Sequence, residues 1–324
     1  MQHSIAILDD YQSVALKVAD WSPIVNAKIP ITVYTDHAAD NATTISRLKP
    51  FTILCIMRER TKFPSSLFAE LPNLKLLVTS GMRNLGIDLK GAKEHGVTVC
   101  GTASGADSTV EIIWSLIFGI AKDTVSNDSR LKNPATANIW QAGRLPTGLA
   151  GRTLGVIGLG RLGIKITTIA KVFGMRVIAW SQNMTAEKAE AAGAEFIGSK
   201  EELMRQSDFV SVHVILSDRT VNLINESDLR MMKKTAFLIN TSRGPIVNES
   251  ALIKILKEDV IAGAALDVFD VEPLPADSEL RSLGDKVLLS PHMGYVCDTT
   301  YDIYFRESVE DIVAFLAGAP IRVM

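Results

Sequence analysis

Three short stretches in the last third of the sequence each supply one side chain suited to chemistry on a carbonyl group. They contain Arg243 in INTSRGPIVNE, Glu272 in LDVFDVEPLP and His292 in SPHMG, and each stretch begins where an apolar run ends. A guanidinium keeps its charge near neutrality, so it can bind a carboxylate and polarise a carbonyl oxygen. An imidazole can give up a proton and take it back, and a carboxylate beside it orients the ring and favours its charged form. Together they predict hydride chemistry on a 2-keto or 2-hydroxy acid, for which no metal is needed.

A glycine-rich turn earlier in the chain predicts where a cofactor binds. GLGRLG follows the apolar run LGVI and precedes a predicted helix at about 161–173. In this context the first glycine allows a tight turn, the second lets the backbone approach a pyrophosphate, and the third lets helix and strand pack closely. The start of the helix adds free N–H groups and the positive end of its dipole. We therefore expect NAD(H) or NADP(H) at this turn. The expected contacts come from Gly158, Gly160, Arg161, Leu162 and Gly163.

The position that usually selects between NAD and NADP does not carry the usual acidic residue. An Asp or Glu about 20 residues beyond the glycine turn normally bonds the ribose of NAD. Here the run MRVIAW ends in Ser181, followed by Gln182 and Asn183. The repulsion that an acid exerts on the extra phosphate of NADP is gone, but no Arg follows to bind that phosphate. Arg161 and Lys188 are remote helpers at most, and a serine at a strand end is also structurally ordinary. The choice of nucleotide therefore stays open.

Alternating apolar and helical segments indicate the framework that must position these residues. Six apolar runs between 153 and 290 have the count and spacing of a complete dinucleotide-binding sheet. Five further runs, from IAILD to VTVC, predict a separate α/β unit within the first 101 residues. Parallel strands of this kind are buried on both faces and bind ligands beyond their carboxyl ends, where the catalytic candidates fall. The predicted fold class is α/β with a doubly wound parallel sheet.

Two helical segments flank this second alternation. Residues 104–132 fit one long helix, and a loop rich in Asn, Pro and Gly follows it up to Gly151. The chain closes with a helix at about 296–317 that no strand follows. A helix of this kind often returns to pack on the first domain, so the two ends of the chain are expected to pack together.

Length, charge and cysteine content narrow the class of protein. A chain of 324 residues predicts two domains, and its 47% hydrophobic and 22% charged residues are typical of a globular protein. A net charge of −2 without a block of Lys or Arg argues against nucleic acid as a partner. Cys55, Cys100 and Cys297 lack CxxC spacing, which indicates reduced thiols in the cytoplasm and no zinc site. The longest apolar stretch, 112–121, is too short to cross a membrane, and no signal peptide is visible.

Four motifs carry a close resemblance to the D-isomer-specific 2-hydroxyacid dehydrogenase family. GLGRLG, NTSRG, LDVFDVEP and SPHMG occur in the family's order and spacing, and the likeness, strongest from 151 to 295, covers almost the whole chain. The family includes phosphoglycerate, glyoxylate/hydroxypyruvate and D-lactate dehydrogenases. By this resemblance Arg243, Glu272 and His292 occupy the catalytic positions.

The same resemblance implies contacts to the cofactor. Asp267 would bond the nicotinamide carboxamide, and Thr241 and Gly294 fall on stretches that line the nicotinamide. His213, in a further stretch of the likeness, is also expected at the cofactor. The implied activity is NAD- or NADP-dependent interconversion of a D-2-hydroxy acid and a 2-keto acid.

The resemblance also implies a domain plan and an assembly. A Rossmann domain, 102–295, would be inserted into a flavodoxin-like substrate domain made of 1–101 and 296–324. The long helix and an arm that carries Trp140 are similar to the family's dimer-forming elements. A homodimer is therefore implied.

Departures from the family pattern bear on the substrate. Ser181 stands where an acid is common, Ile215 stands where a proline is common, and the carboxylate-binding loop, usually similar to GVGxD, is Gly81-Met82-Arg83-Asn84-Leu85. A second loop carrying Arg58 leaves the neighbouring strand. Arg58 and Glu59 could simply be a solvated surface pair. Alternatively, Arg58 or Arg83 binds a second anionic group beside Met82, and the substrate is then larger and more acidic than lactate.

Two classes of function remain open. The chain is either a dehydrogenase or a nucleotide-responsive binding module, since the C-terminal-binding-protein corepressors resemble the same family. The presence of Arg243, Glu272 and His292 favours the enzyme. Turnover of a keto acid separates the two.

Overall fold

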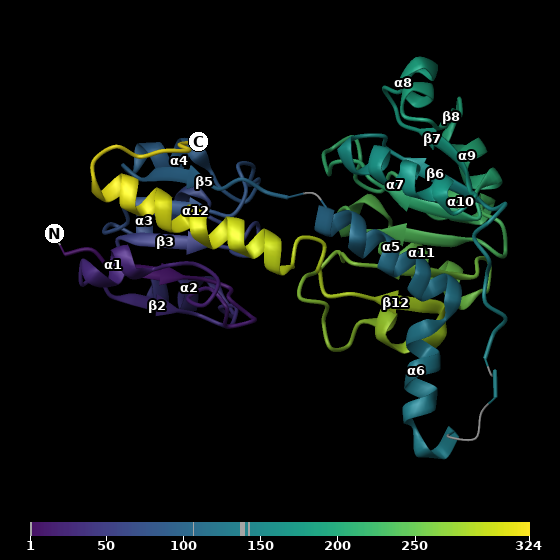
Figure 1. The fold of residues 1–324 in the computed structure, drawn as a ribbon, viewed down its shortest axis with the longest axis horizontal. Coiled ribbons are helices and arrows are strands. Elements are labelled where there is room, and N and C mark those ends of the chain that lie inside the picture. Colours follow the sequence, from purple (N-terminus) through teal and green to yellow (C-terminus); the bar gives the residue numbers. More distant parts are fainter. Residues whose placement is uncertain (1, 106, 137–139, 142) are drawn as a thin grey trace. The chain divides into compact units, whose positions relative to one another are not determined.

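The computed structural model describes residues 2–105, 107–136, 140–141 and 143–324. The chain divides into two compact units (Figure 1). Unit 1 contains Met1–Gly105 and Val296–Met324, and unit 2 contains Ala106–Tyr295.

Unit 1 is built on a five-stranded parallel sheet. The strands, in their order across the sheet, are β2 (Ile31–Val33), β1 (Ile5–Ile7), β3 (Ile53–Ile56), β4 (Leu76–Thr79) and β5 (Thr98–Gly101). The helices are α1 (Ser22–Asn26), α2 (Asn41–Leu48), α3 (Ser65–Glu70), α4 (Leu89–Glu94) and α12 (Asp298–Leu316). Side chains of α2, α3 and α4 share one apolar cluster with the central strands, while α12 packs on β4 and contacts α1. All five apolar runs predicted as strands are strands. The central strands β1, β3 and β4 are buried between two layers, whereas the edge strand β2 is only partly buried.

The C-terminal helix lies in unit 1, as expected, but the chain continues past it as a short pairing segment. Val323 forms an antiparallel bridge with Cys100, and the Met324 N–H donates to the Val99 carbonyl at 2.9 Å. Arg322 Nε donates to the buried carboxylate of Asp311 at 2.9 Å. As predicted, no strand follows this helix, and the single bridge satisfies part of the exposed edge of β5.

Unit 2 is built on a seven-stranded parallel sheet. The strands, in their order across the sheet, are β12 (Val287–Leu289), β11 (Gly263–Leu266), β10 (Phe237–Asn240), β9 (Phe209–Val212), β6 (Thr153–Ile157), β7 (Arg176–Trp180) and β8 (Glu195–Phe196). Six of these were predicted. The seventh, β8, has only two residues, both exposed, so it leaves no apolar run in the sequence.

Helices cover both faces of this sheet. One apolar cluster joins the strands to α5 (Asp107–Lys122) and α7 (Arg161–Val172). A second joins them to α9 (Lys200–Gln206), α10 (Glu226–Met231) and α11 (Glu249–Lys257), and α8 (Ala186–Ala191) contacts β8. The short 3₁₀ helices are η1 (Pro134–Thr136), η2 (Gly244–Ile246), η3 (Glu279–Ser282) and η4 (Gly284–Lys286). The predicted α/β class with a doubly wound sheet is confirmed. Within the described ranges, no helix has both the length and the apolar character that a bilayer span requires.

The prediction of a single helix over 104–132 is wrong. The first helix, α5, ends at Lys122, and α6 (Thr124–Lys132) begins after Asp123, whose φ is +56°. Asp tolerates this left-handed conformation better than most residues. The buried Asp123 carboxylate also accepts a hydrogen bond from Arg130 at 2.9 Å. The interruption thus comes from one residue inside a helical pattern. In the predicted arm, Trp140 is 89% exposed, while 137–139 and 142 lie outside the described residues.

Candidate active site and nucleotide pocket

The three glycines of the turn after β6 are required for different structural reasons. Gly158 has a φ of +96°, and a Cβ there would lie 2.9 Å from the His213 backbone. A Cβ on Gly163 would lie 2.5 Å from the Gly158 carbonyl oxygen, so this glycine is required for helix α7 to pack on the turn. A Cβ on Gly160 would meet no described atom within 4 Å. The chain itself thus needs Gly158 and Gly163, whereas Gly160 keeps a space open.

That open space fits the phosphates of a dinucleotide. Gly160 is the N-cap of α7, and it has no side chain with which to cap the first N–H groups. Arg161 is the exposed first residue of this helix, and Leu162 packs toward the α5 and α7 cluster. The helix start therefore presents backbone donors and its positive dipole end beside the gap at Gly160.

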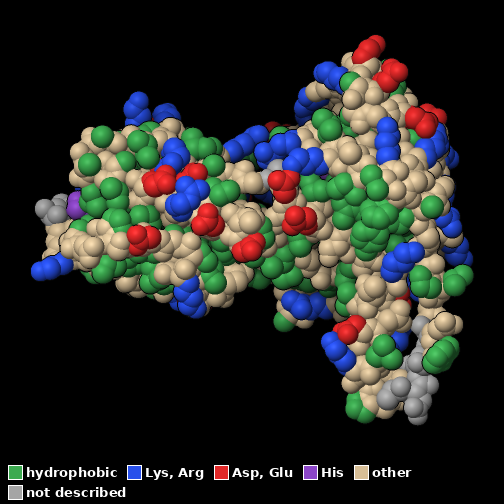
Figure 2. All heavy atoms as spheres, viewed as in Figure 1, with side chains coloured by type: hydrophobic (Ala, Val, Ile, Leu, Met, Phe, Trp, Pro, Cys, Tyr) green, Lys and Arg blue, Asp and Glu red, His purple; other side chains and the backbone are tan. Residues whose placement is uncertain are grey.

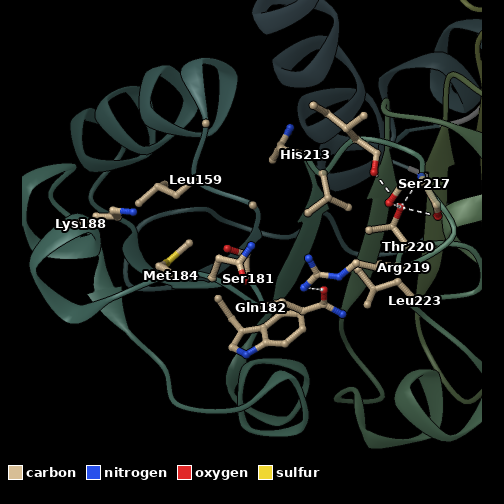
Figure 3. Close-up of a pocket in the computed structure, with 16 residues that line it drawn as sticks. Leu159, Ser181, Gln182, Met184, Lys188, His213, Ser217, Arg219, Thr220 and Leu223 are labelled. Atoms are coloured by element: carbon tan, nitrogen blue, oxygen red, sulfur yellow. Dashed lines mark hydrogen bonds between the residues drawn. The ribbon is translucent and has the colours of Figure 1, made fainter. Parts of the chain in front are cut away.

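A pocket with a volume of about 410 Å³ lies next to the glycine turn, beyond the carboxyl ends of β6, β7 and β9 (Figure 3). Of the predicted cofactor contacts, Gly158, Gly160, Ser181 and His213 line it. Lys188 from α8 lines it as well, whereas Arg161 does not. The size and position of this pocket suit the adenosine half of the nucleotide.

Arg219 in this pocket is not among the residues that the sequence motifs predict. Its Nη2 donates to Gln182 Oε1 at 2.7 Å, across a separation of 37 positions in the chain. The arginine comes from the loop after β9, so a search for an Arg directly after Ser181 could not find it. Strands β9 and β7 flank β6 on its two sides, and this sheet order brings Arg219 to the end of β7.

His213 forms part of the pocket wall as a neutral ring. Its Nε2 lies 2.8 Å from Ser211 Oγ, and its Nδ1 is buried without a hydrogen-bond partner among the described residues. Burial lowers the pKa of His213 to about 3. The ring is therefore uncharged at neutral pH.

The three catalytic candidates follow three strands that are neighbours in the sheet. Strands β10, β11 and β12 run side by side, with Asn240 in register with Leu266 and Leu266 with Leu289. Arg243, Glu272 and His292 lie in the loops that directly follow these strand ends. All three belong to unit 2, so one sheet edge positions them.

Glu272 and His292 form a direct pair. His292 Nδ1 lies 2.6 Å from Glu272 Oε2, and the side chains are 17% and 25% exposed, respectively. The other carboxylate oxygen, Oε1, accepts the Phe269 N–H at 3.1 Å. The carboxylate is thus fixed by the backbone of its own loop and in turn fixes one nitrogen of the imidazole.

The loop of Arg243 is braced from two sides. Asn240 Nδ2 donates to the Arg243 carbonyl at 3.0 Å, and Ser242 Oγ donates to the Val212 carbonyl at 3.0 Å. A Cβ on Gly244 would lie 2.0 Å from the carbonyl carbon of Phe269. The Arg243 loop therefore lies in backbone contact with the loop that carries Glu272, and only glycine permits this approach.

Asp267 holds the loop of His292. Its carboxylate is 1% exposed and accepts hydrogen bonds from Ser290 Oγ at 2.5 Å, Met293 N at 2.8 Å and Gly294 N at 2.9 Å. Burial raises the pKa of Asp267, and these hydrogen bonds oppose that shift. Its part in binding nicotinamide stays a prediction, as do those of Gly294 and Thr241, which directly follows β10.

The substrate candidates Arg58, Met82 and Arg83 belong to unit 1. Arg58 has a φ of +49°, its N–H donates to Ser80 Oγ at 2.9 Å, and its guanidinium lies where a Cβ of Gly81 would be. The suspected pair with Glu59 is present at 3.7 Å, but the two side chains are only 20% and 26% exposed. Arg58 therefore packs on the Gly81 loop, whereas Met82 and Arg83 are exposed.

The doubly wound sheet, its glycine turn and the His–Glu pair at its carboxyl edge define a nucleotide-dependent dehydrogenase. Residues 114–294 match the NAD-binding domain of the D-isomer-specific 2-hydroxyacid dehydrogenases. The chain belongs to this family, as its motifs predicted, and is an NAD(P)-dependent D-2-hydroxyacid dehydrogenase.

Individual proteins that are similar to this chain support the assignment to this family. A glyoxylate reductase of Aeropyrum pernix is 37% identical over 263 residues, which cover 78% of this chain and 76% of that protein. A D-3-phosphoglycerate dehydrogenase of Methanocaldococcus jannaschii is 34% identical over 77% of this chain and 47% of its own length. The crystal structure of a phosphoglycerate oxidoreductase from Vibrio cholerae O395 superposes with a TM-score of 0.90 at 35% identity, covering 98% of this chain and all of that one.

Proposed function

We propose that this enzyme reduces a small 2-keto acid, and oxidises the matching D-2-hydroxy acid, with Arg243, Glu272 and His292 as its catalytic group. The observation that carries the proposal is the 2.6 Å contact between His292 Nδ1 and Glu272 Oε2. An imidazole held by a carboxylate on one nitrogen can exchange a proton through the other nitrogen.

Each side chain has a separate part in this chemistry. The bound nicotinamide supplies the hydride in reduction and accepts it in oxidation. Arg243 binds the substrate carboxylate and polarises the carbonyl oxygen, because its planar fork matches that group. His292 gives the proton to the carbonyl oxygen through Nε2 and takes it back in the reverse direction. Glu272 keeps the ring oriented by its contact with Nδ1, which leaves Nε2 facing the substrate.

Unit 1 is proposed as the substrate domain. The relatives named glyoxylate reductase and phosphoglycerate dehydrogenase support small keto acids as the substrate class, some with a second anionic group. Arg58, Met82 and Arg83 lie in two adjoining loops of unit 1 and supply two guanidinium groups for such an anion. We therefore expect a preference for dianionic substrates over pyruvate.

A homodimer is proposed from an apolar surface of unit 2. Trp114 and Phe118 on α5 pack against Phe173 after α7, with ring centroids 5.0 to 5.6 Å apart. Val172 beside them is 80% exposed and Ile164 is 44% exposed. Figure 2 shows hydrophobic side chains gathered over this part of unit 2. Sedimentation velocity tests it: the wild type should sediment as a dimer and Val172→Glu as a monomer.

A cytoplasmic location is also proposed. Cys55 and Cys100 are buried free thiols, which are typical of proteins kept in a reducing compartment. Burial raises the pKa of each of these thiols to about 12, so neither is a reactive thiolate at neutral pH.

The experiment that tests the function is a spectrophotometric screen. Glyoxylate, hydroxypyruvate, phosphohydroxypyruvate, 2-oxoglutarate and pyruvate are each offered with NADH and with NADPH. Turnover of at least one is expected. The substitution Arg83→Ala should lower kcat/KM for dianionic substrates more than for pyruvate. Nucleotide binding without turnover on any of them would instead favour a binding module of the corepressor kind. An equal loss of activity on all substrates would show that Arg83 does not bind a second anionic group.

A further inference from the structure

The nucleotide pocket of unit 2 contains basic side chains but no acidic ones near the turn that follows β7. Ser181, Gln182 and Asn183 form the turn after β7, and Lys188 and Arg219 reach the pocket from two other elements. Among the described residues that line it there is no Asp or Glu. Asp218, the acid next to Arg219 in sequence, is exposed and does not line it. The pocket therefore carries two positive charges without a compensating acid in its wall.

The guanidinium of Arg219 is held in place by a neutral group. Its Nη2 donates to the amide oxygen of Gln182 at 2.7 Å. A guanidinium has five N–H donors, so this single bond leaves most of its donor capacity for another acceptor. Because the partner is an amide and not a carboxylate, the positive charge of Arg219 is not neutralised by it. Figure 3 shows the Arg219 side chain pointing toward Gln182 and Ser181.

The loop that carries Arg219 is ordered by its own hydrogen bonds. Thr220 Oγ1 accepts the Ser217 N–H at 2.7 Å and donates to the Ile215 carbonyl at 2.7 Å. These bonds fix the backbone on both sides of Asp218 and Arg219 before any ligand arrives. A loop backbone that is already fixed costs less entropy to use in binding than one that must first be ordered.

We propose that this pocket selects NADP(H) over NAD(H) by binding the 2′-phosphate of the adenosine ribose, with Arg219 as the specificity-determining residue. The proposal deepens the nicotinamide-dependent function above and rests on it only for the identity of the ligand. The guanidinium fork matches a phosphate, and the Ser181 hydroxyl can donate to the same group. Gln182 positions the guanidinium, and Lys188 adds a second, longer-range charge. An acid in place of Ser181 would repel this phosphate, and none is present.

The test uses nucleotide fragments that lack nicotinamide, so it needs no turnover. The full-length protein is titrated calorimetrically with adenosine 2′,5′-bisphosphate and with adenosine 5′-monophosphate. We expect the bisphosphate to bind about tenfold tighter or better, since a hydrogen bond to a charged group contributes about 1.5–3 kcal/mol. Arg219→Ala should lower the affinity for the bisphosphate about 10- to 100-fold and change that for the monophosphate less than about twofold.

Two further variants make the result specific. Arg205→Ala removes an exposed arginine from α9 of the same unit and should change neither affinity. Ser181→Asp should reverse the preference, because its carboxylate repels the 2′-phosphate and accepts from the ribose hydroxyls. Unchanged thermal unfolding temperatures show that the variants are folded.

The proposal is overturned if the wild type binds both fragments equally, or if Arg219→Ala weakens both by the same factor. The second result would mean that Arg219 shapes the pocket without recognising phosphate. Neither result depends on keto-acid turnover. Failure of this inference is therefore distinguishable from failure of the proposed reaction.

Discussion

The catalytic edge of unit 2 and its nucleotide pocket are built in contrasting ways. At the edge, Arg243, Glu272 and His292 each follow the strand that positions them, and their loops are fixed by short internal bonds such as the 2.6 Å His292–Glu272 contact. In the pocket, Arg219 reaches Gln182 from a loop 37 positions away. A residue that functions at the end of the strand it follows can be recognised as part of a sequence motif. A residue that functions at the end of a different strand can be recognised only when the order of strands in the sheet is known.

The largest effect is expected from a substitution that removes a catalytic side chain and leaves the nucleotide pocket intact. His292→Asn should lower the rate of keto-acid reduction about 10²- to 10⁴-fold, the usual contribution of a general acid. Binding of adenosine nucleotides should stay within about twofold of the wild type, because His292 does not line the nucleotide pocket. Steady-state kinetics and calorimetry measure the two effects. An unchanged rate would show that another group supplies the proton.

A pair of glycine substitutions separates folding from nucleotide binding within the turn. Gly163→Ala should destabilise the protein by about 1–3 kcal/mol, because the new methyl would lie 2.5 Å from the Gly158 carbonyl oxygen. Gly160→Ala should leave the free energy of unfolding within about 1 kcal/mol and weaken dinucleotide binding, because its methyl projects into the space kept for phosphate. Urea denaturation and calorimetry distinguish them. Equal effects of both substitutions on stability would contradict the separate roles.

The smallest expected effect concerns the pH dependence of stability at the pocket wall. His213 takes up a proton at its ordinary pKa of 6.5 when unfolded but only at about 3 when folded. Between these values the unfolded state binds more protons, so the stability present above pH 6.5 is lost as the pH falls. In His213→Asn the loss between pH 7 and pH 5 should be smaller than in the wild type. Urea denaturation at both pH values measures this, and parallel losses would show that His213 does not stay neutral in the folded protein.

Much of the architecture could be predicted because short apolar runs alternate regularly with helical segments along both units. Every predicted strand is present, and the catalytic candidates do follow the strand ends expected of them. The break at Asp123 escaped prediction because one residue in the left-handed conformation leaves the helical pattern intact on both sides. The two-residue strand β8 escaped because both its residues are exposed.

The supporting residues of the site were the least visible in sequence. Asp267 was predicted as a cofactor contact, and that role stays a prediction. Its second role was not predicted: this residue is 1% exposed and bonds the His292 loop three times. Asn240 and Gly244 brace the Arg243 loop, and only a polar residue at the end of an apolar strand hinted at the first of them. Such contacts join separate loops, so no spacing within one motif encodes them.

A double-mutant cycle on the rate of keto-acid reduction tests the central claim most directly. If Glu272 acts only through the imidazole that it holds, the variant carrying both Glu272→Gln and His292→Asn should be no slower than His292→Asn alone. Independent roles would give a double variant slowed by the product of the two single effects, and that result would contradict the pair as one catalytic unit.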